Sequence, residues 1–129
     1  MITAPISPGE LLDKISILQI KRERIRDQTA ARHILLELEL LERTRDHAIH
    51  PSEELSALLV ELANANRTLW DIEDALRHHE RTQDFGETFV QLARAVYLTN
   101  DRRAALKRHI NQLLCSALVE QKCYVKYAG

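Results

Sequence analysis

The sequence predicts an all-α fold: an antiparallel bundle of three to four long helices with a short C-terminal extension, in one domain of residues 1–129. Three observations predict it. Glycine and proline number only three each, too few for the many turns of a β-rich fold. Apolar residues recur at helical spacing through most of the chain. Hydrophobic residues make up 45% of the composition, enough to build the core of one domain.

The first helical segment is expected over residues 8–47. It opens with Ser7 at the N-cap position, Pro8 at the first helical position and a glutamate at N3, which together form a capping box. No large apolar residue stands between Arg26 and His33. A bend or break there would let the segment fold back on itself, and the pattern leaves open whether it forms one helix or two.

Two further start signals divide the rest of the chain. Ser52 precedes two glutamates, which favour the positive end of a helix dipole. Asp84 and Glu87 repeat the spacing of a capping box. The connections before these signals are short, so we expect sequential helices to be antiparallel neighbours. After about Glu120 the helical period fades, which indicates a docked extension.

Charge and composition argue against several classes of protein. The formal net charge is −1, so no basic excess favours nucleic acid or a membrane surface as a partner. No apolar run approaches the roughly 18 residues that span a bilayer, and the N-terminal residues lack a signal-peptide pattern, so we expect a cytoplasmic protein. Cys115 and Cys123 are too few for a disulfide framework, and we expect reduced thiols.

Polar residues interrupt the apolar stripes of two predicted helices. Asn66 and Glu73 share a helix face with leucines, and Asn100 and Lys107 break the stripe of the last helix. Burying such groups is costly unless they are paired or face a ligand. We call this set the polar seam, together with the flanking candidates Lys14, Lys21, Trp70, Asp74, Arg94, Tyr97 and Asn111.

Two interpretations of the polar seam stay open. Its lysines and arginine could neutralise a phosphate or carboxylate, its Asn and Tyr side chains could orient that ligand, and Trp70 could provide a stacking wall. Alternatively, Glu73 pairs with Lys107 or Lys21 in a structural network, and the asparagines only set helix register.

No motif of established chemistry is present, so the sequence predicts no catalytic residue, no metal ligand and no particular cofactor. A metal-dependent phosphohydrolase is a further hypothesis. Glu73 and Asp74 follow Trp70, and Glu10 with Asp13 would add the carboxylates that Mg²⁺ prefers. Their spacing does not reproduce the paired acidic motifs of helical nucleotide pyrophosphatases.

Four phrases of the sequence resemble a known family. They are SPGELLDKISIL at residues 7–18, LWDIED at 69–74, LARAVYLTND at 92–101 and LVEQKCY at 118–124. Together they resemble a family of short bacterial all-helical proteins classed as a domain of unknown function. The LWxxED phrase is also similar to a second helical family that is associated with genes for envelope-sugar transfer. That similarity implies a sugar-nucleotide or phosphorylated-sugar context.

These observations lead to two principal hypotheses. The first is a site between helices for an anionic ligand such as a phosphorylated sugar or a nucleotide. Its ligand-binding residues would be Lys14, Lys21, Asn66, Trp70, Glu73, Asp74, Arg94, Tyr97, Asn100, Lys107 and Asn111. The second is a non-enzymatic interaction module, either a homodimer or a partner of an envelope-polysaccharide enzyme, in which the seam only sets helix register.

Overall fold

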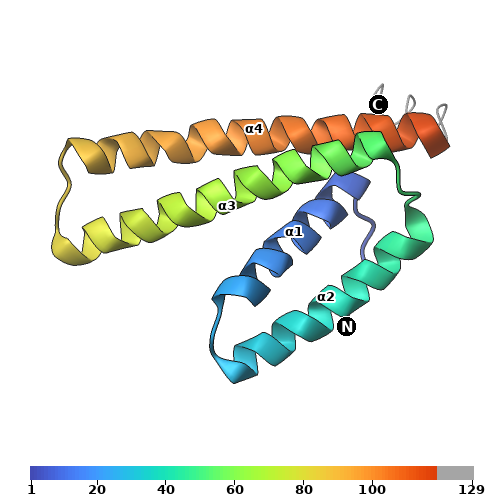
Figure 1. Ribbon diagram of the computed structural model, residues 1–129, viewed down its shortest axis with the longest axis horizontal. Helices are drawn as coiled ribbons and strands as arrows, with labels where there is room; N and C mark the ends of the chain where they lie inside the picture. Colours follow the sequence, from blue (N-terminus) through green and yellow to red (C-terminus); the bar gives the residue numbers. More distant parts are fainter. Residues whose placement is uncertain (119–129) are drawn as a thin grey trace.

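The computed structural model describes residues 1–118, which form four helices and no strand (Figure 1). The helices are α1 (Pro8–Arg24), α2 (Gln28–Ala48), α3 (Glu53–Thr82) and α4 (Glu87–Leu118). The predicted all-α class is therefore confirmed. The predicted C-terminal extension lies outside the described residues.

The four helices form two hairpins of unequal length. The longer hairpin pairs α3 with α4, and the shorter pairs α1 with α2 (Figure 1). Helix α1 packs against all three other helices, whereas α2 packs against α1 alone among the described helices. As a result, α1 lies at the centre of the packing, and the α3–α4 hairpin extends beyond it.

The predicted N-caps of two helices are confirmed. The Ser7 hydroxyl accepts a hydrogen bond from the Glu10 backbone N–H at 3.2 Å. The Ser52 hydroxyl accepts from the Leu55 backbone N–H at 3.1 Å. Each bond satisfies a backbone donor that has no partner within its own helix, which explains why these helices begin where the sequence indicates.

The first helical segment is two helices rather than one. The break falls at residues 25–27. It therefore lies at the start of the stretch without large apolar residues between Arg26 and His33, and most of that stretch belongs to α2. Asp27 is the cause, because its carboxylate accepts from the Ala30 backbone N–H at 2.8 Å and starts a new helix. The residues that follow therefore remain helical in spite of their polarity.

The start of α4 differs from the predicted capping box. Because the helix begins at Glu87, that residue is the first helical position and not the third. The turn is closed by Gln83, which adopts a left-handed conformation with φ 55°, and by the Asp84 carboxylate, which accepts from the Gly86 backbone N–H at 3.3 Å. Asp84 thus stabilises the turn between the helices and does not cap α4.

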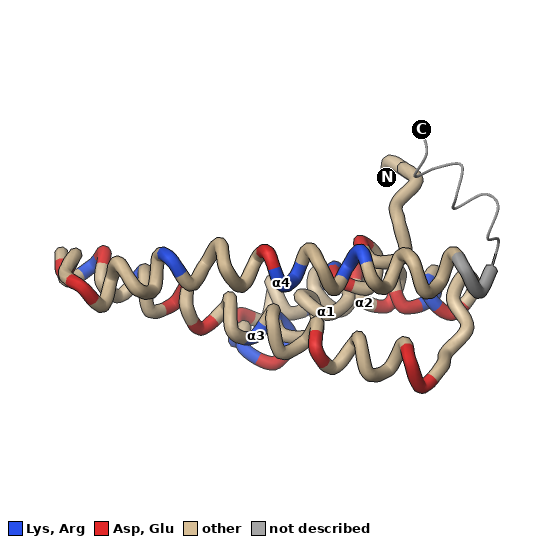
Figure 2. The backbone as a smooth tube through the Cα atoms, turned by 90° about the horizontal axis from the view of Figure 1, so that it is seen from above, with Lys and Arg blue, Asp and Glu red and all other residues tan. Residues whose placement is uncertain are grey.

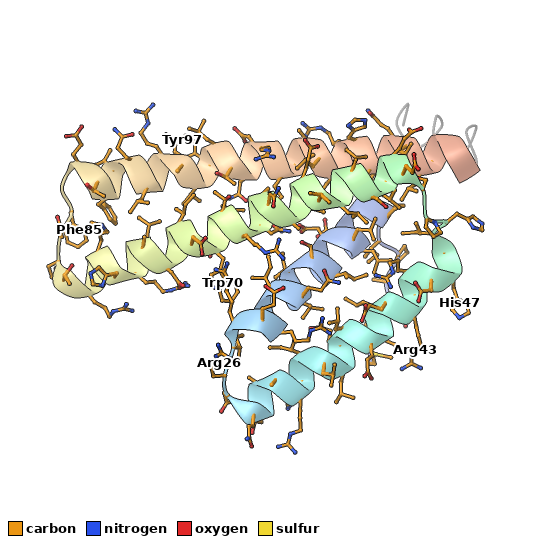
Figure 3. All side chains as sticks on the ribbon, viewed as in Figure 1. Arg26, Arg43, His47, Trp70, Phe85 and Tyr97 are labelled. Atoms are coloured by element: carbon orange, nitrogen blue, oxygen red, sulfur yellow. The ribbon has the colours of Figure 1, made fainter. Side chains whose placement is uncertain are left out.

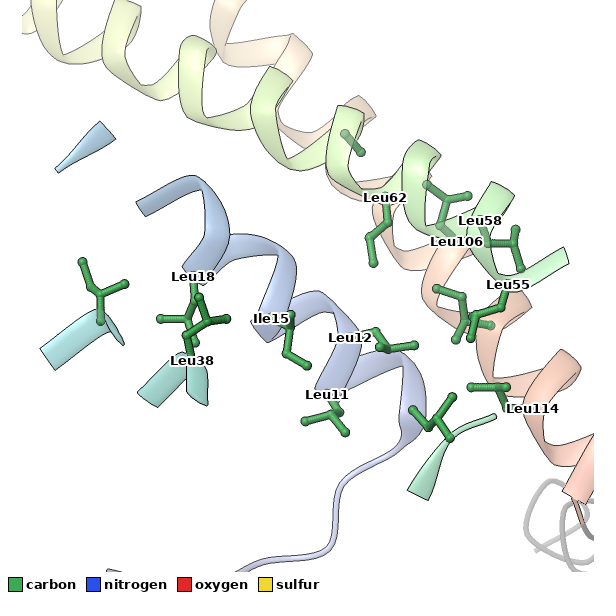
Figure 4. Packing of buried hydrophobic residues seen from close by; sticks show 14 residues of the cluster. Leu11, Leu12, Ile15, Leu18, Leu38, Leu55, Leu58, Leu62, Leu106 and Leu114 are labelled. Carbon is green, nitrogen blue, oxygen red and sulfur yellow. The ribbon is translucent and has the colours of Figure 1, made fainter. Parts of the chain in front are cut away.

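The hydrophobic core is centred on α1 and extends to every other helix (Figure 4). Leu12 and Ile15 of α1 lie within it, as do Leu38 of α2, Leu62 of α3 and Ile110 of α4. The last three are fully buried. Burial of this apolar surface is the main stabilising term of the fold.

Acidic and basic positions are interspersed along the helices (Figure 2). In the described part of the chain, no helix is both long enough and apolar enough to cross a membrane. Cys115 is disulfide-bonded, so the expectation of a reduced thiol is wrong at that position, and Cys123 lies outside the described residues. The expectation rested on the redox state of the cytosol and not on the geometry of the chain.

Candidate functional site

A buried carboxylate joins three helices at the centre of the molecule. Asp13 of α1 is only 1% exposed. Its Oδ1 accepts from Asn66 Nδ2 of α3 at 3.1 Å and from Arg103 Nε of α4 at 2.9 Å. Arg103 Nη2 donates to Oδ2, so the guanidinium holds the carboxylate through two parallel bonds.

Neighbouring polar groups complete this network. Asn66 Nδ2 also donates to the Ser16 hydroxyl at 3.2 Å. Lys107 Nζ lies 2.7 Å from a carboxylate oxygen of Glu10 and 3.7 Å from Asp13 Oδ2. Among the described residues, no buried side-chain nitrogen or oxygen lacks a hydrogen-bond partner. The buried polar atoms of the network are therefore all paired, as burial requires.

The electrostatics of this network keep both members of the central pair charged. Burial by itself would raise the pKa of Asp13, but hydrogen bonds from Arg103 and Asn66, with the charges of Arg103 and Lys107, hold that pKa below its ordinary value. The hydrogen bond to Asp13 raises the pKa of Arg103 despite its partial burial. The pair is thus a fixed ion pair that presents the guanidinium in one orientation.

A close contact between the start of α1 and α4 makes this geometry possible. The Gly9 backbone N–H donates to Asn111 Oδ1 at 2.7 Å. A Cβ atom on Gly9 would lie 2.6 Å from the carbonyl oxygen of Lys107, a distance that the backbone could not accommodate without shifting. Glycine therefore allows α1 to approach α4 closely enough for Asp13 to reach Arg103.

A pocket of about 270 Å³ lies beside the network, between α1, α3 and α4. It is lined by Ile17, Lys21, Asn66, Leu69, Trp70, Glu73, Asn100 and Arg103. Its volume is close to the lower limit for small-molecule sites, which are typically about 300–1,000 Å³. The pocket suits a small metabolite better than a nucleotide.

The pocket combines polar groups with an apolar wall. Lys21 and Glu73 contribute opposite charges, and neither forms an ion pair within residues 1–118. Arg103 Nη1 makes only a long bond, 3.4 Å, to Asn100 Oδ1. Trp70 points from α3 toward the α1 side of the molecule (Figure 3), where the Arg24 guanidinium carbon lies 5.9 Å from its ring centroid.

The structure gathers seven of the predicted seam residues at or beside this pocket. Lys21, Asn66, Trp70, Glu73 and Asn100 line it directly. Lys107 and Asn111 belong to the adjoining network and do not line the pocket. The face assignments made from sequence spacing thus placed residues of three separate helices around one pocket.

The other four predicted residues lie elsewhere. Lys14 is exposed on α1 and faces the groove toward α2. Asp74 pairs with Arg77 on the surface of α3 at 2.9 Å. Arg94 is exposed on α4, and the Tyr97 side chain points away from α3 (Figure 3). We therefore do not include these four residues in the pocket.

Sequence reasoning missed the two residues at the centre of the site. The sequence analysis considered Asp13 only as a possible metal ligand, and Arg103 was not among the predicted ligand-binding residues. A signal for Asp13 was available, because Gly9 lies four positions before it and Ile20 seven positions after it, which places the three residues on one face of a capped helix. Its choice of partner depends on how the helices cross, which spacing does not reveal.

Two sequence hypotheses are affected by this geometry. The predicted pairing of Glu73 with Lys107 or Lys21 does not occur, because Lys107 pairs with Glu10 and Asp13. The phosphohydrolase hypothesis required acidic residues to converge. Within residues 1–118, no three His, Cys, Asp or Glu side chains are arranged to hold a metal ion. Asp13 and Asp74 are instead engaged by arginines.

Comparison with known proteins identifies a family for the chain. No curated protein and no solved structure matches the chain. A family model described as "Family of unknown function (DUF6165)" matches residues 2–128. The match spans nearly the whole chain, all four helices included. The chain therefore belongs to this family of unknown function.

Proposed function

We propose that this protein binds a small anionic metabolite, such as a phosphorylated sugar, in the pocket between α1, α3 and α4. The observation that supports the proposal is Lys21, a partly buried lysine in the pocket wall that has no ion-pair partner in the described part of the chain. Partial burial of an unpaired charge is unfavourable, so an anion in the pocket would improve its environment.

Arg103 supplies the second positive group. Its side chain is 25% exposed, and Asp13 engages its Nε and Nη2. The Nη1 edge is therefore the part of the guanidinium most available to a ligand in the pocket. Because Asp13 holds the guanidinium in place, little conformational entropy would be lost on binding. Asn66, Asn100 and Trp70 would orient the ligand against the wall of the pocket.

A thermal-shift screen tests this proposal. The probes are inorganic phosphate, phosphorylated sugars and sugar nucleotides, each with and without Mg²⁺. A ligand at about 100 times its dissociation constant adds roughly 2.7 kcal/mol to the free energy of unfolding, which raises the melting temperature measurably. We expect Lys21→Gln to abolish the shift.

Lys14→Gln is the matched control. Lys14 stands two helical turns earlier on α1, is exposed, has no ion-pair partner among the described residues and lies outside the pocket. This variant should keep the full shift. A shift that survives Lys21→Gln would place the ligand elsewhere, and the absence of any shift from anionic compounds would contradict the proposal.

A second candidate function is self-association, and one observation favours it. Beyond the reach of α1, the α3–α4 hairpin exposes Phe85, Val90, Tyr97 and Leu98, the last two to more than half of their surface. Exposed apolar side chains of this kind are common at protein interfaces. Sedimentation equilibrium would show a dimer if this function is correct, and a monomer throughout the micromolar range would count against it.

A further inference from the structure

Positive and negative side chains in and beside the pocket balance each other. This balance defines the class of ligand more narrowly than the proposed function does. Lys21 and Arg103 are positive, and Glu73 and the adjoining Asp13 are negative. The four groups together carry no net charge. A phosphate dianion would gain from Lys21 but would also experience repulsion from Glu73 in the same small volume.

Glu73 places a negative charge in the pocket wall that a purely anionic ligand would not use. It lines the pocket, and its negative charge helps to raise the pKa of Arg103, yet no Lys, Arg or His side chain lies within ion-pair distance of its carboxylate in residues 1–118. Its neighbour Asp74 provides a contrast: both residues are exposed, but Asp74 is paired with Arg77 and lies outside the pocket. In the pocket, Glu73 therefore offers an acceptor for a positively charged or hydrogen-donating group.

The amide of Asn66 offers a second acceptor. Its Nδ2 donates to both Asp13 and Ser16, which uses the two hydrogens of the amide nitrogen. The carbonyl oxygen Oδ1 accepts no hydrogen bond among the described residues and so is not one of the buried atoms, and the residue lines the pocket. The pocket thus presents donors at Lys21 and Arg103 and acceptors at Glu73 and Asn66, with Trp70 and Leu69 forming an apolar wall.

We infer that the ligand is a small zwitterion, which carries an anionic group for Lys21 and Arg103 and an ammonium group for Glu73. This inference rests on the proposed function and adds the positive group. A pocket of about 270 Å³ accommodates a molecule of this class, such as a free amino acid or an amino-sugar phosphate. The remaining apolar part of the ligand would pack against Trp70.

Titration calorimetry on the full chain tests the inference with paired probes. The panel contains the α-amino acids and glucosamine 6-phosphate, each beside its N-acetylated form, together with glucose 6-phosphate and inorganic phosphate. Acetylation removes the ammonium charge and leaves the anionic group in place. We expect a zwitterion to bind and its N-acetylated form to bind at least about tenfold more weakly, since hydrogen bonds to charged groups contribute about 1.5–3 kcal/mol.

The variant Glu73→Gln separates the two ligand classes. It keeps the shape of the side chain and removes its charge, so a zwitterion should bind about tenfold more weakly. A purely anionic ligand should bind as well as before, or better, because a repulsive charge has gone. Asp74→Asn is the matched control, and it should leave the affinity unchanged because Asp74 lies outside the pocket.

The outcomes distinguish failure of the zwitterion inference from failure of the proposed function. Binding of zwitterions that weakens on N-acetylation and in Glu73→Gln supports the inference. Binding of glucose 6-phosphate or phosphate that depends on Lys21 but not on Glu73 overturns the inference and leaves the proposed function intact. If no probe binds in either assay, both the inference and the proposed function fail.

Discussion

Helices α1 and α2 form one hairpin but occupy very different environments. Helix α1 buries eight of its 17 residues, including the polar Asp13 and Ser16. Helix α2 is longer, yet it buries only Ile34 and Leu38 of its 21 residues. The two helices differ in burial because α1 packs against three helices and α2 against one. Figure 3 shows Arg43 and His47 of α2 pointing away from α1.

The contrast teaches how to interpret an amphipathic pattern. Helix α2 has the more one-sided distribution of apolar residues, because it has a single neighbour and a broad exposed face. In α1 the buried residues extend around more of the helix, which makes it look less amphipathic. In this fold, the more regular pattern marks the peripheral helix, and the less regular pattern marks the central helix that carries the buried carboxylate.

The largest expected difference between α1 and α2 comes from removing a carboxylate from each. Asp13→Ala leaves the partly buried Arg103 without its partner and should lower the free energy of unfolding by about 3 kcal/mol or more. Glu37→Ala, at an exposed position of α2, should change it by no more than about 0.5 kcal/mol. Urea denaturation of both variants measures these changes. A loss below about 1 kcal/mol in Asp13→Ala would show that the network contributes little to stability.

The acid dependence of stability is the next largest effect. The folded-state pKa of Asp13 lies below its ordinary value of 3.8, so its carboxylate stabilises the fold above that pH. This contribution is lost as the pH falls from about 4 through the lower folded-state pKa, with a slope of at most about 1.4 kcal/mol per pH unit.

Asp13→Asn isolates this contribution because it removes the titrating group. We expect the wild-type protein to lose stability more steeply than Asp13→Asn below about pH 4, so that their urea midpoints converge in acid. Other carboxylates titrate in both proteins and cancel in the comparison. Parallel pH profiles for the two proteins would contradict the assignment of a depressed pKa to Asp13.

The smallest expected effect is the loss of stability on removing an N-cap side chain, and this loss should be equal for α1 and α2. Ser7→Ala removes the N-cap of α1, and Asp27→Ala removes that of α2. Each should cost about 1 kcal/mol, because a cap acts on the backbone donors of its own helix. Thermal denaturation measures both, with Thr29→Ala in the first turn of α2 as the control. A much larger cost for Ser7→Ala would show that α1 depends on its cap for tertiary packing.

The candidate site was partly predictable from the chain. Asn66, Glu73 and Asn100 were identified because each breaks an apolar stripe at helical spacing, and all three line the pocket. Tyr97 and Arg94 lie close to Asn100 in sequence but are exposed on α4. The predicted faces were too broad, since a residue adjacent to a buried stripe can face either a neighbouring helix or solvent.

The sequence by itself determined the local structure of this protein. N-cap side chains, apolar periodicity and the scarcity of glycine and proline act through neighbouring residues, so they specified a helical chain with starts at Pro8 and Glu53. The tertiary structure alone decided which helix is central, that Asp13 meets Arg103 ninety residues away, and that Lys21 and Glu73 share one pocket. Those contacts depend on how closely and at what angle the helices cross, and the approach of Gly9 to Lys107 controls this distance through packing that no local pattern encodes.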